Sequence, residues 1–387
     1  MARKESGILI FLLILVFGIS GGKAYPQNAD SLLNILHQQA KKEKIIIFLQ
    51  LAELSKADHP MQAEAYLDTA LLMAKQYNYD SLISAAAYKK GAAALGQGMI
   101  REAREYLQTS YLHYHRENDE RGYGNLLDLL GETYARLGRL DTAYAILQSS
   151  LDLKLGMKDT AAIARVYIKI GNVNYLNGNL ERAHASYRKA TDYFRLLQDK
   201  HGIATASMNL GNVYEELGKP DSAKYFYYTA LQLNEKLGDY KDISILLNNL
   251  GVFHLNQGNN DSAIYYLTKS SEAAGKINDH YQIAVLKNNI GLIHDKNKEF
   301  RKAQETYLEA LRLAKANHYL QLERSIYQNL AANYANTGDF KKAYETHSKY
   351  AALNDSINDL ETKERISSLQ FEFEKKGRSK RSGQRVT

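Results

Sequence analysis

The side chains that could perform catalysis do not form a recognisable catalytic set in this sequence. His113 and His115 are two positions apart, and residues with that spacing point to different sides of a helix, so they are poorly placed to share a metal ion. Ser186 and Lys189 have the spacing of a penicillin-binding nucleophile and its lysine, but the companion motifs of those enzymes are missing. No zinc-protease motif, phosphate-binding loop or catalytic triad is apparent. The sequence therefore predicts a protein that is not an enzyme, with no catalytic residue, no metal site and no cofactor.

Asparagine is the residue type that could perform binding chemistry here. An amide side chain both donates and accepts hydrogen bonds, so a row of amides can hold the backbone of an extended peptide whatever its side chains are. Two cations beside the row could add a contact to a carboxylate. The predicted peptide-binding residues are Asn172, Asn209, Asn212, Asn249, Asn289, Asn329, Arg165 and Lys169.

A sequence repeat must position these side chains. Glycine recurs at every fortieth position, and a second glycine series and an alanine series follow it by seven and twelve positions. An unbroken period of this length is typical of a repeat array, in which each unit buries its apolar face against its neighbours. Leu51, Asp58 and Ala63 mark a degenerate first unit, which makes eight. The first series is Gly91, Gly131, Gly171, Gly211, Gly251 and Gly291, closed by Ala331; the second is Gly98, Gly138, Gly178, Gly218, Gly258 and Gly338, interrupted by Lys298; the third is Ala103, Ala143, Ala183, Ala223, Ala263, Ala303 and Ala343.

Each unit reads as two helices. In the unit 204–243, apolar residues recur at spacings of three and four from Ala204 to Leu217, and Gly218-Lys219-Pro220 ends that helix. A second helix is predicted from Asp221 to Leu237. An aspartate precedes each following first helix, where it could accept hydrogen bonds from unpaired backbone N–H groups. These aspartates are Asp119, Asp159, Asp199, Asp239 and Asp279.

Small residues are expected where helices approach closely. Gly211 and Ala223 are predicted at the crossing of the two helices of one unit, because a large side chain there would separate them. Ala230 and its equivalents are predicted where one unit meets the next: Ser110, Ser150, Ala190, Ser270 and Ala310. An aromatic cluster on the second helices is expected to pack mostly between repeats, with an exposed remainder as a second contact patch: Tyr225, Phe226, Tyr228, Tyr265 and Tyr266.

The repeat resembles the tetratricopeptide signature. The resemblance is carried by Leu210-Gly211-Asn212-Val213-Tyr214 with Gly218, Ala223, Tyr227 and Ala230, and it covers about 44–363. The chain lacks the usual tryptophan, and its unit spans forty positions where the usual unit has about 34. This long variant is similar to the repeats of kinesin light chains and bacterial quorum-peptide receptors, which bind peptides or partner helices.

That resemblance implies an all-α fold, an α-solenoid in which about eight helix-turn-helix repeats form a right-handed superhelix. Its concave wall would be built mainly from first helices, where the predicted binding residues lie. Asparagine is also common at two of these positions in the family whatever the ligand, so an amide row there has a structural explanation as well as a functional one.

The ends of the chain predict further segments. Residues 1–24 read as a signal peptide, because Arg3 and Lys4 precede a short apolar stretch and small residues precede Tyr25. An uncleaved N-terminal membrane anchor is the alternative. A lead helix is expected at 25–43, a C-terminal capping helix at 356–376 and a basic disordered tail at 377–387. The expected location is therefore outside the cytoplasm, in the periplasm, or at the membrane if the segment stays attached.

The net charge of +7 does not indicate nucleic-acid binding. Residues 1–24 carry +2 and residues 375–387 carry +6, which leaves −1 for 25–374. A nucleic-acid-binding fold would carry its basic residues on a folded face. The chain has no cysteine, so an exported form would be held together by packing alone.

Two functions stay open at this point. The lead Asp30-Ser31-Leu32-Leu33 and the closing Leu353-Asn354-Asp355-Ser356 resemble the exported sensor region of bacterial histidine kinases and helix-turn-helix regulators. One hypothesis is a non-catalytic scaffold of the cell envelope that binds a protein or peptide segment. The other is a sensor module of a signal-transduction system that lacks its output domain, with a signalling partner and membrane proximity through the N-terminal segment.

Overall fold

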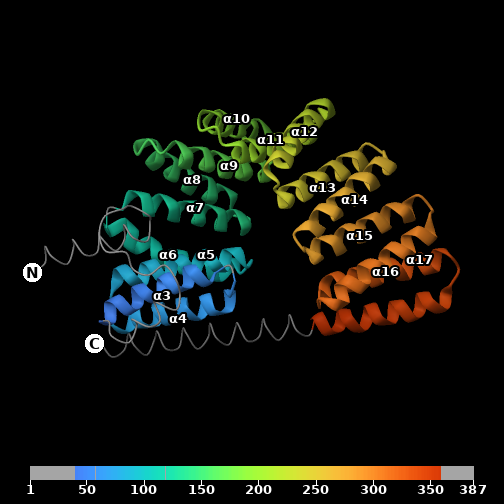
Figure 1. Ribbon diagram of the computed structural model, residues 1–387, viewed down its shortest axis with the longest axis horizontal. Helices are drawn as coiled ribbons and strands as arrows, with labels where there is room; N and C mark the ends of the chain where they lie inside the picture. Colours follow the sequence, from blue (N-terminus) through green and yellow to red (C-terminus); the bar gives the residue numbers. More distant parts are fainter. Residues whose placement is uncertain (1–39, 57, 118, 359–387) are drawn as a thin grey trace, which may run out of the picture. The chain divides into compact units, whose positions relative to one another are not determined.

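A computed structural model describes residues 40–56, 58–117 and 119–358 of the chain. The predicted signal peptide, most of the lead helix and of the capping helix, and the basic tail lie outside the described residues. Every element in the described part is an α-helix (Figure 1), so the predicted all-α class is confirmed. The chain divides into two compact units, Met1–Gly202 and Ile203–Thr387.

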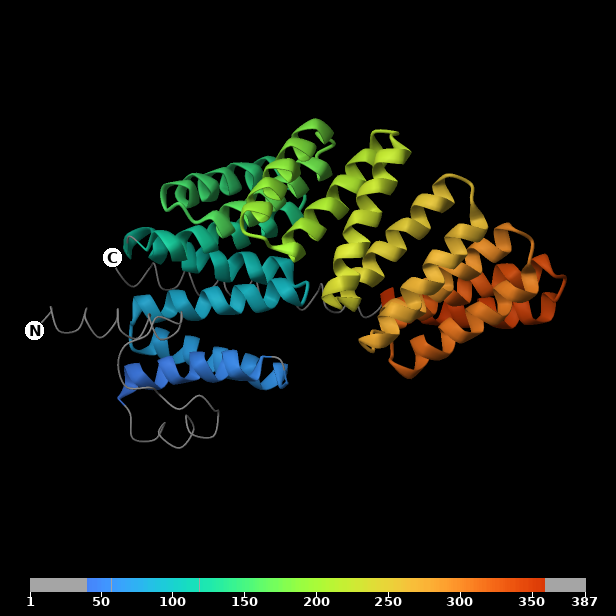
Figure 2. The ribbon, with the colours of Figure 1, turned by 45° about the horizontal axis from the view of Figure 1, so that its top comes forward.

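The first unit contains four helical hairpins, in which each first helix packs along the second helix that follows it. Each second helix also packs against the next first helix, so the hairpins stack in sequence order (Figures 1 and 2). The helices are α3 (Lys41–Ser55), α4 (Pro60–Gln76), α5 (Asp80–Gly96), α6 (Ile100–Glu117), α7 (Glu120–Arg136), α8 (Leu140–Gly156), α9 (Thr160–Leu176) and α10 (Leu180–Leu196).

The second unit repeats this arrangement, and α11 (Lys200–Glu216) begins just before the division between the units. The last described residues, 340–358, are helical without a break at Ser356 and form the second helix of the eighth hairpin. The described residues thus form eight hairpins, stacked within each unit as in an α-solenoid. The other helices are α12 (Pro220–Leu237), α13 (Tyr240–Asn256), α14 (Asn260–Lys276), α15 (His280–Lys296), α16 (Phe300–Ala316) and α17 (Leu320–Asn336).

The helices recur every twenty residues, which is half the forty-residue period of the sequence. From Pro60 onward each helix begins twenty positions after the one before it. Inside the hairpins, the second glycine series adopts positive φ angles of 66–80°, and Lys298 shares this conformation at 61°. Between hairpins the equivalent residue is also left-handed, although only Gly238 is a glycine there. The others are Asn78, Lys158, Gln198, Asn278 and His318, with φ of 52–55°.

A hydrogen bond closes each of these turns. The N–H of Met99 donates to the carbonyl of Ala94 at 2.9 Å, and the N–H of Asp159 donates to the carbonyl of Lys154 at 3.1 Å. This five-residue step is the Schellman arrangement, which satisfies carbonyl groups at the end of a helix. Both kinds of turn therefore terminate their helices in the same way, with or without glycine.

The predicted aspartate caps are confirmed at five first helices. In each case the carboxylate accepts a hydrogen bond from the backbone N–H three residues later, which satisfies one of the unpaired donors at the start of the helix. The bond lengths lie between 2.9 and 3.1 Å. The capping residues are Asp119, Asp159, Asp199, Asp239 and Asp279.

The first glycine series lies where the two helices of a hairpin cross, as predicted. A Cβ atom added to Gly211 would stand 2.6 Å from the ring of Tyr227, sixteen positions later. The same step joins Gly91 to Leu107 and Gly171 to Tyr187. The alanine series is also fully buried from Ala103 through Ala303. The close approach is thus made by a leucine or tyrosine that packs directly on the glycine.

Three serine equivalents of Ala230 make contacts that the sequence did not predict. Ser150 Oγ donates to the carbonyl of Gly124 at 3.1 Å, and Ser270 Oγ donates to that of Ser244 at 2.7 Å. Ser84 Oγ donates to the carbonyl of Ser110 at 2.9 Å. These bonds run within one hairpin rather than to the next repeat. Within the described part of the chain, no helix has both the length and the apolar character needed to cross a membrane.

A candidate peptide-binding surface on the first helices

The predicted binding residues all lie on first helices, and they fall in both units. Arg165, Lys169 and Asn172 are on α9 in the first unit. The second unit holds the remaining five asparagines, on α11, α13, α15 and α17. Arg165 and Asn172 are exposed, whereas the other members are partly buried.

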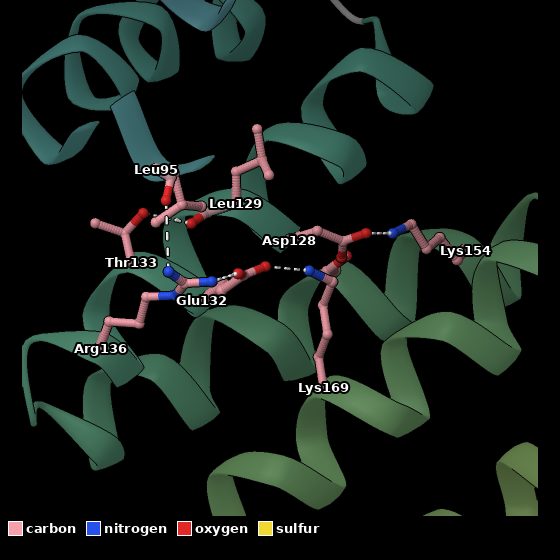
Figure 3. A network of polar contacts seen from close by, with 9 residues as sticks. Leu95, Asp128, Leu129, Glu132, Thr133, Arg136, Lys154 and Lys169 are labelled. Atoms are coloured by element: carbon pink, nitrogen blue, oxygen red, sulfur yellow. Dashed lines mark hydrogen bonds and ion pairs between the residues drawn. The ribbon is translucent and has the colours of Figure 1, made fainter. Parts of the chain in front are cut away.

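Lys169 takes part in a ladder that joins three successive first helices (Figure 3). Its Nζ lies 2.7 Å from Glu132 Oε2 on α7, and Arg136 donates to Glu132 Oε1 at 2.9 Å. Arg136 also donates to the carbonyl of Leu95 on α5 at 3.4 Å. Burial would raise the pKa of Glu132, but Lys169 and Arg136 outweigh it and hold that pKa below its usual value. Lys169, predicted to meet a ligand carboxylate, already meets the carboxylate of Glu132.

A second polar group lies deeper in the same hairpins. The side chain of Lys154 on α8 is only 2% exposed and forms an ion pair with Asp128 on α7 (Figure 3). Ser150 Oγ also lies 2.6 Å from Asp128 Oδ1. Burial lowers the pKa of Lys154, and Asp128 opposes that shift. Such a pair has little access to a ligand, and it fixes how α7 and α8 pack.

Two of the predicted asparagines are oriented by buried tyrosines. The hydroxyl of Tyr187 donates to Asn172 Oδ1 at 2.8 Å, and that of Tyr227 lies 2.7 Å from Asn212 Oδ1. Burial raises the pKa of Tyr187. The tyrosine that packs on the repeat's glycine therefore also holds the asparagine that follows the glycine.

The amides of the second unit connect neighbouring first helices. Asn249 Nδ2 on α13 donates to Asn212 Oδ1 on α11 at 3.4 Å. Asn329 Nδ2 on α17 donates to Asn288 Oδ1 on α15 at 3.0 Å. The side chain of Asn289 makes no hydrogen bond to any described residue, although it occupies on α15 the repeat position that Asn249 has on α13. Some amides of the row thus pair with one another, and these side chains are oriented before any ligand binds.

Carboxylates on the same surface were missed by the sequence reasoning. Glu215 on α11 accepts from Asn256 Nδ2 at 3.0 Å, and Asp295 on α15 accepts from Asn333 Nδ2 at 2.6 Å. Glu132 holds the repeat position of Asn172 and Asn212, so extending that series back by one unit would have found it. The surface therefore combines amides with acidic groups, rather than amides alone.

The motifs set aside as non-catalytic are placed as follows. Ser186 Oγ donates to the carbonyl of Arg182 at 2.8 Å, and Lys189 Nζ lies 5.2 Å from the centre of the Tyr167 ring. These two side chains thus have separate structural contacts. The side chains of His113 and His115 lie outside the described part of the chain.

The aromatic cluster on the second helices packs within hairpins as well as between them, where packing mostly between repeats was predicted, and it has an exposed remainder. Phe226 stacks on Tyr214 at 5.2 Å, and Tyr266 stacks on His254 at 5.1 Å. Tyr225 and Tyr265 remain 66% and 57% exposed. Both stacks lie within single hairpins, α11 with α12 and α13 with α14, whereas the hydrogen bond between the hydroxyls of Tyr228 and Tyr266 joins neighbouring hairpins.

Comparisons with known proteins agree with this architecture. A family model described as tetratricopeptide repeat matches residues 122–196, 159–236 and 242–316. The sequence has no significant match among curated proteins. Several solved structures are similar to this chain in fold, although their sequence identity to it is low.

The signal transduction ATPase of the STAND class with a tetratricopeptide repeat sensor from Pyrococcus horikoshii has a TM-score of 0.58 and 17% identity, over 85% of this chain and 53% of that one. The apo form of the quorum sensor NprR from B. thuringiensis has a TM-score of 0.56 and 17% identity, over 84% and 97%. A Rap protein complexed with competence and sporulation factor has a TM-score of 0.54 and 12% identity, over 86% and 97%.

Stacked antiparallel hairpins, six of them with a glycine at the crossing, define an α-helical repeat protein. The matched repeats, the signature residues and the fold together place the chain in the tetratricopeptide repeat family, in a variant whose unit spans forty positions.

Proposed function

We propose that this protein is a non-catalytic scaffold that binds a peptide or protein segment on the first helices of its second unit. The observation that carries the proposal is the amide row on α11, α13, α15 and α17, in which Asn249 and Asn329 are oriented by contacts with the neighbouring first helix. A surface that is ordered before binding loses less conformational entropy when the ligand arrives. Amides that can both donate and accept suit the backbone of an extended segment.

The similar structures support the proposal at the level of fold. One of them was solved as a complex with competence and sporulation factor, and another is a quorum sensor. Those properties belong to these proteins. The alternative hypothesis of a sensor module in signal transduction uses the same surface, so one binding experiment serves both.

Replacing Asn209, Asn249 and Asn289 together by alanine tests the binding surface. We expect capture of partners from the envelope fraction of the source cells to fall at least tenfold, because three backbone-binding amides are lost, while thermal unfolding stays cooperative. A matched control replaces three exposed residues of second helices by alanine and should capture normally. These control residues are Gln232, Glu235 and Arg312. Undiminished capture by the asparagine variant would move the site elsewhere.

We also propose that the protein acts outside the cytoplasm, exported through its N-terminal segment. The charged start, the apolar stretch and the small residues before Tyr25 support this. Fractionation of cells that express the full chain, with N-terminal sequencing of the product, should find periplasmic protein that begins at Tyr25. An intact N-terminus in the membrane fraction would favour the anchored form, and a cytoplasmic product would contradict export.

A further inference from the structure

Two neighbouring repeat boundaries of the second unit differ on the side of the second helices. At the boundary between α12 and α14, Tyr228 and Tyr266 share a hydrogen bond between their hydroxyls. Tyr266 also stacks on His254 of α13, with ring centroids 5.1 Å apart and planes 6° apart. Both ring nitrogens of His254 are buried and have no hydrogen-bond partner among the described residues. Aromatic rings therefore fill this boundary.

One repeat later the rings are replaced by small side chains. Forty positions after Tyr228 and Tyr266 stand Thr268 on α14 and Thr306 on α16. The histidine is kept, as His294 on α15. A recess of about 390 Å³ opens here, lined by both threonines and by the histidine. This volume lies within the range of roughly 300–1,000 Å³ that is usual for ligand sites.

The recess keeps a rigid floor. His294 Nδ1 lies 2.6 Å from Glu299 Oε2, which fixes the plane of the imidazole ring. Ile290 on α15 is buried beside it, and Ile264 on α14 is partly buried, so both offer apolar contact. A flat ring with aliphatic neighbours is the environment in which an aromatic side chain binds well.

The rim of the recess carries charged side chains. Lys287 stands in the place of Leu247, and its Nζ lies 2.5 Å from Glu309 Oε2. Glu272 also lines the recess. An ammonium group, two carboxylates and two threonine hydroxyls thus surround an apolar floor, and they can pair with a hydroxyl group that enters with a ring.

We propose that this recess binds a tyrosine side chain of a partner protein. Its ring would pack on His294 as Tyr266 packs on His254, and its hydroxyl would meet the polar rim. The protein itself shows the occupant, because tyrosine fills the equivalent space one repeat earlier. The recess lies between second helices and is lined by a different face of α15 from Asn289, so the inference goes beyond the amide row and stands independently of it.

The test uses N-acetyl-tyrosinamide as the probe and the full-length protein with ¹³C-labelled isoleucine methyl groups. We expect ring-current shifts at the methyl signals of Ile264 and Ile290, which saturate at millimolar probe, the affinity expected of so small a ligand. Ile243, which does not line the recess, should not shift. N-acetyl-phenylalaninamide should bind at least threefold more weakly, because it lacks the hydroxyl.

Filling the recess supplies the decisive variant. Thr268→Tyr with Thr306→Tyr restores the pair found one repeat earlier, so the protein should fold with an unchanged or higher melting temperature and should lose the probe-induced shifts. Gln232→Tyr, which adds a tyrosine on an exposed part of α12, should keep them. Absence of shifts in the unmodified protein, shifts that persist in a folded filled variant, or equal binding of the phenylalanine probe would each overturn the proposal.

Discussion

Glycine recurs at the helix crossing of six of the eight repeats because a leucine or a tyrosine packs directly on its backbone. At Gly171, Gly211 and Gly291 the packed residue is a tyrosine, and at Gly91 it is a leucine. Tyr227 is only 1% exposed and is held by Asn212, so its ring has little freedom to move away. The glycine thus sets the distance between the two helices of its hairpin.

Gly211→Ala should reduce the free energy of unfolding by about 1–3 kcal/mol, because the added methyl group would overlap the Tyr227 ring. Urea unfolding monitored by circular dichroism measures the change. Gly275→Ala is the matched control, since a Cβ atom there meets nothing within 4 Å. The control should be neutral or slightly stabilising, because alanine is the better helix former. Equal stability of both variants would contradict the packing described here.

Single residues also show how far the sequence could lead. The glycine and alanine series and the aspartate caps were predictable, because each reflects one residue type that one backbone position requires. The partners of the predicted binding residues were not, because pairs such as Lys169 with Glu132 are 37 residues apart and change identity from repeat to repeat. The recess was invisible as well, since Thr268 and Thr306 become informative only when the structure places them together.

Turns are the elements in which sequence and backbone disagree most. The sequence marks only one of the two turns of a repeat with glycine, whereas the backbone has a left-handed residue in both kinds of turn. Lys298 interrupts the glycine series and yet keeps its conformation, with a φ of 61°. A side chain in this region costs roughly 1–2 kcal/mol relative to the right-handed conformation, and glycine avoids most of that cost.

Lys298→Gly should therefore raise the free energy of unfolding by about 0.5–1 kcal/mol, with part of the gain offset by the greater freedom of glycine in the unfolded chain. Differential scanning calorimetry would record a higher melting temperature. Lys298→Ala removes the same charged side chain but keeps the Cβ atom, so it should bring no gain. If both variants were equally stabilised, the charge of Lys298 would be responsible rather than its backbone conformation.

Buried tyrosines in both units make the free energy of unfolding depend on pH in the alkaline range. Burial raises the pKa of Tyr187 in the first unit and, together with the hydrogen bond to Asp295, that of Tyr307 in the second. Above about pH 10 the unfolded chain releases these protons while the folded chain retains them. The free energy of unfolding therefore falls as the pH rises through this range, and it is unaffected by these groups below it.

Urea unfolding at about pH 9 and about pH 11 should show this loss of stability. The double variant Tyr187→Phe with Tyr307→Phe should be less stable at the lower pH, because the hydrogen bonds to Asn172 and Asp295 are removed. Its further loss between the two pH values should be smaller than that of the unmodified protein. An equal loss in both proteins would assign the alkaline effect to other groups, such as lysines.

The shared geometry of the two kinds of turn has a consequence for how such a gene can change. From Asp80 onward each helix starts at the same interval, and, apart from α7, whose preceding turn contains residue 118 outside the described part, each follows the same kind of left-handed turn. Unequal recombination that adds or removes a complete hairpin consequently brings together two segments whose backbones already fit. Proteins of this construction can lengthen or shorten during evolution while side chains alone adapt at the new junction.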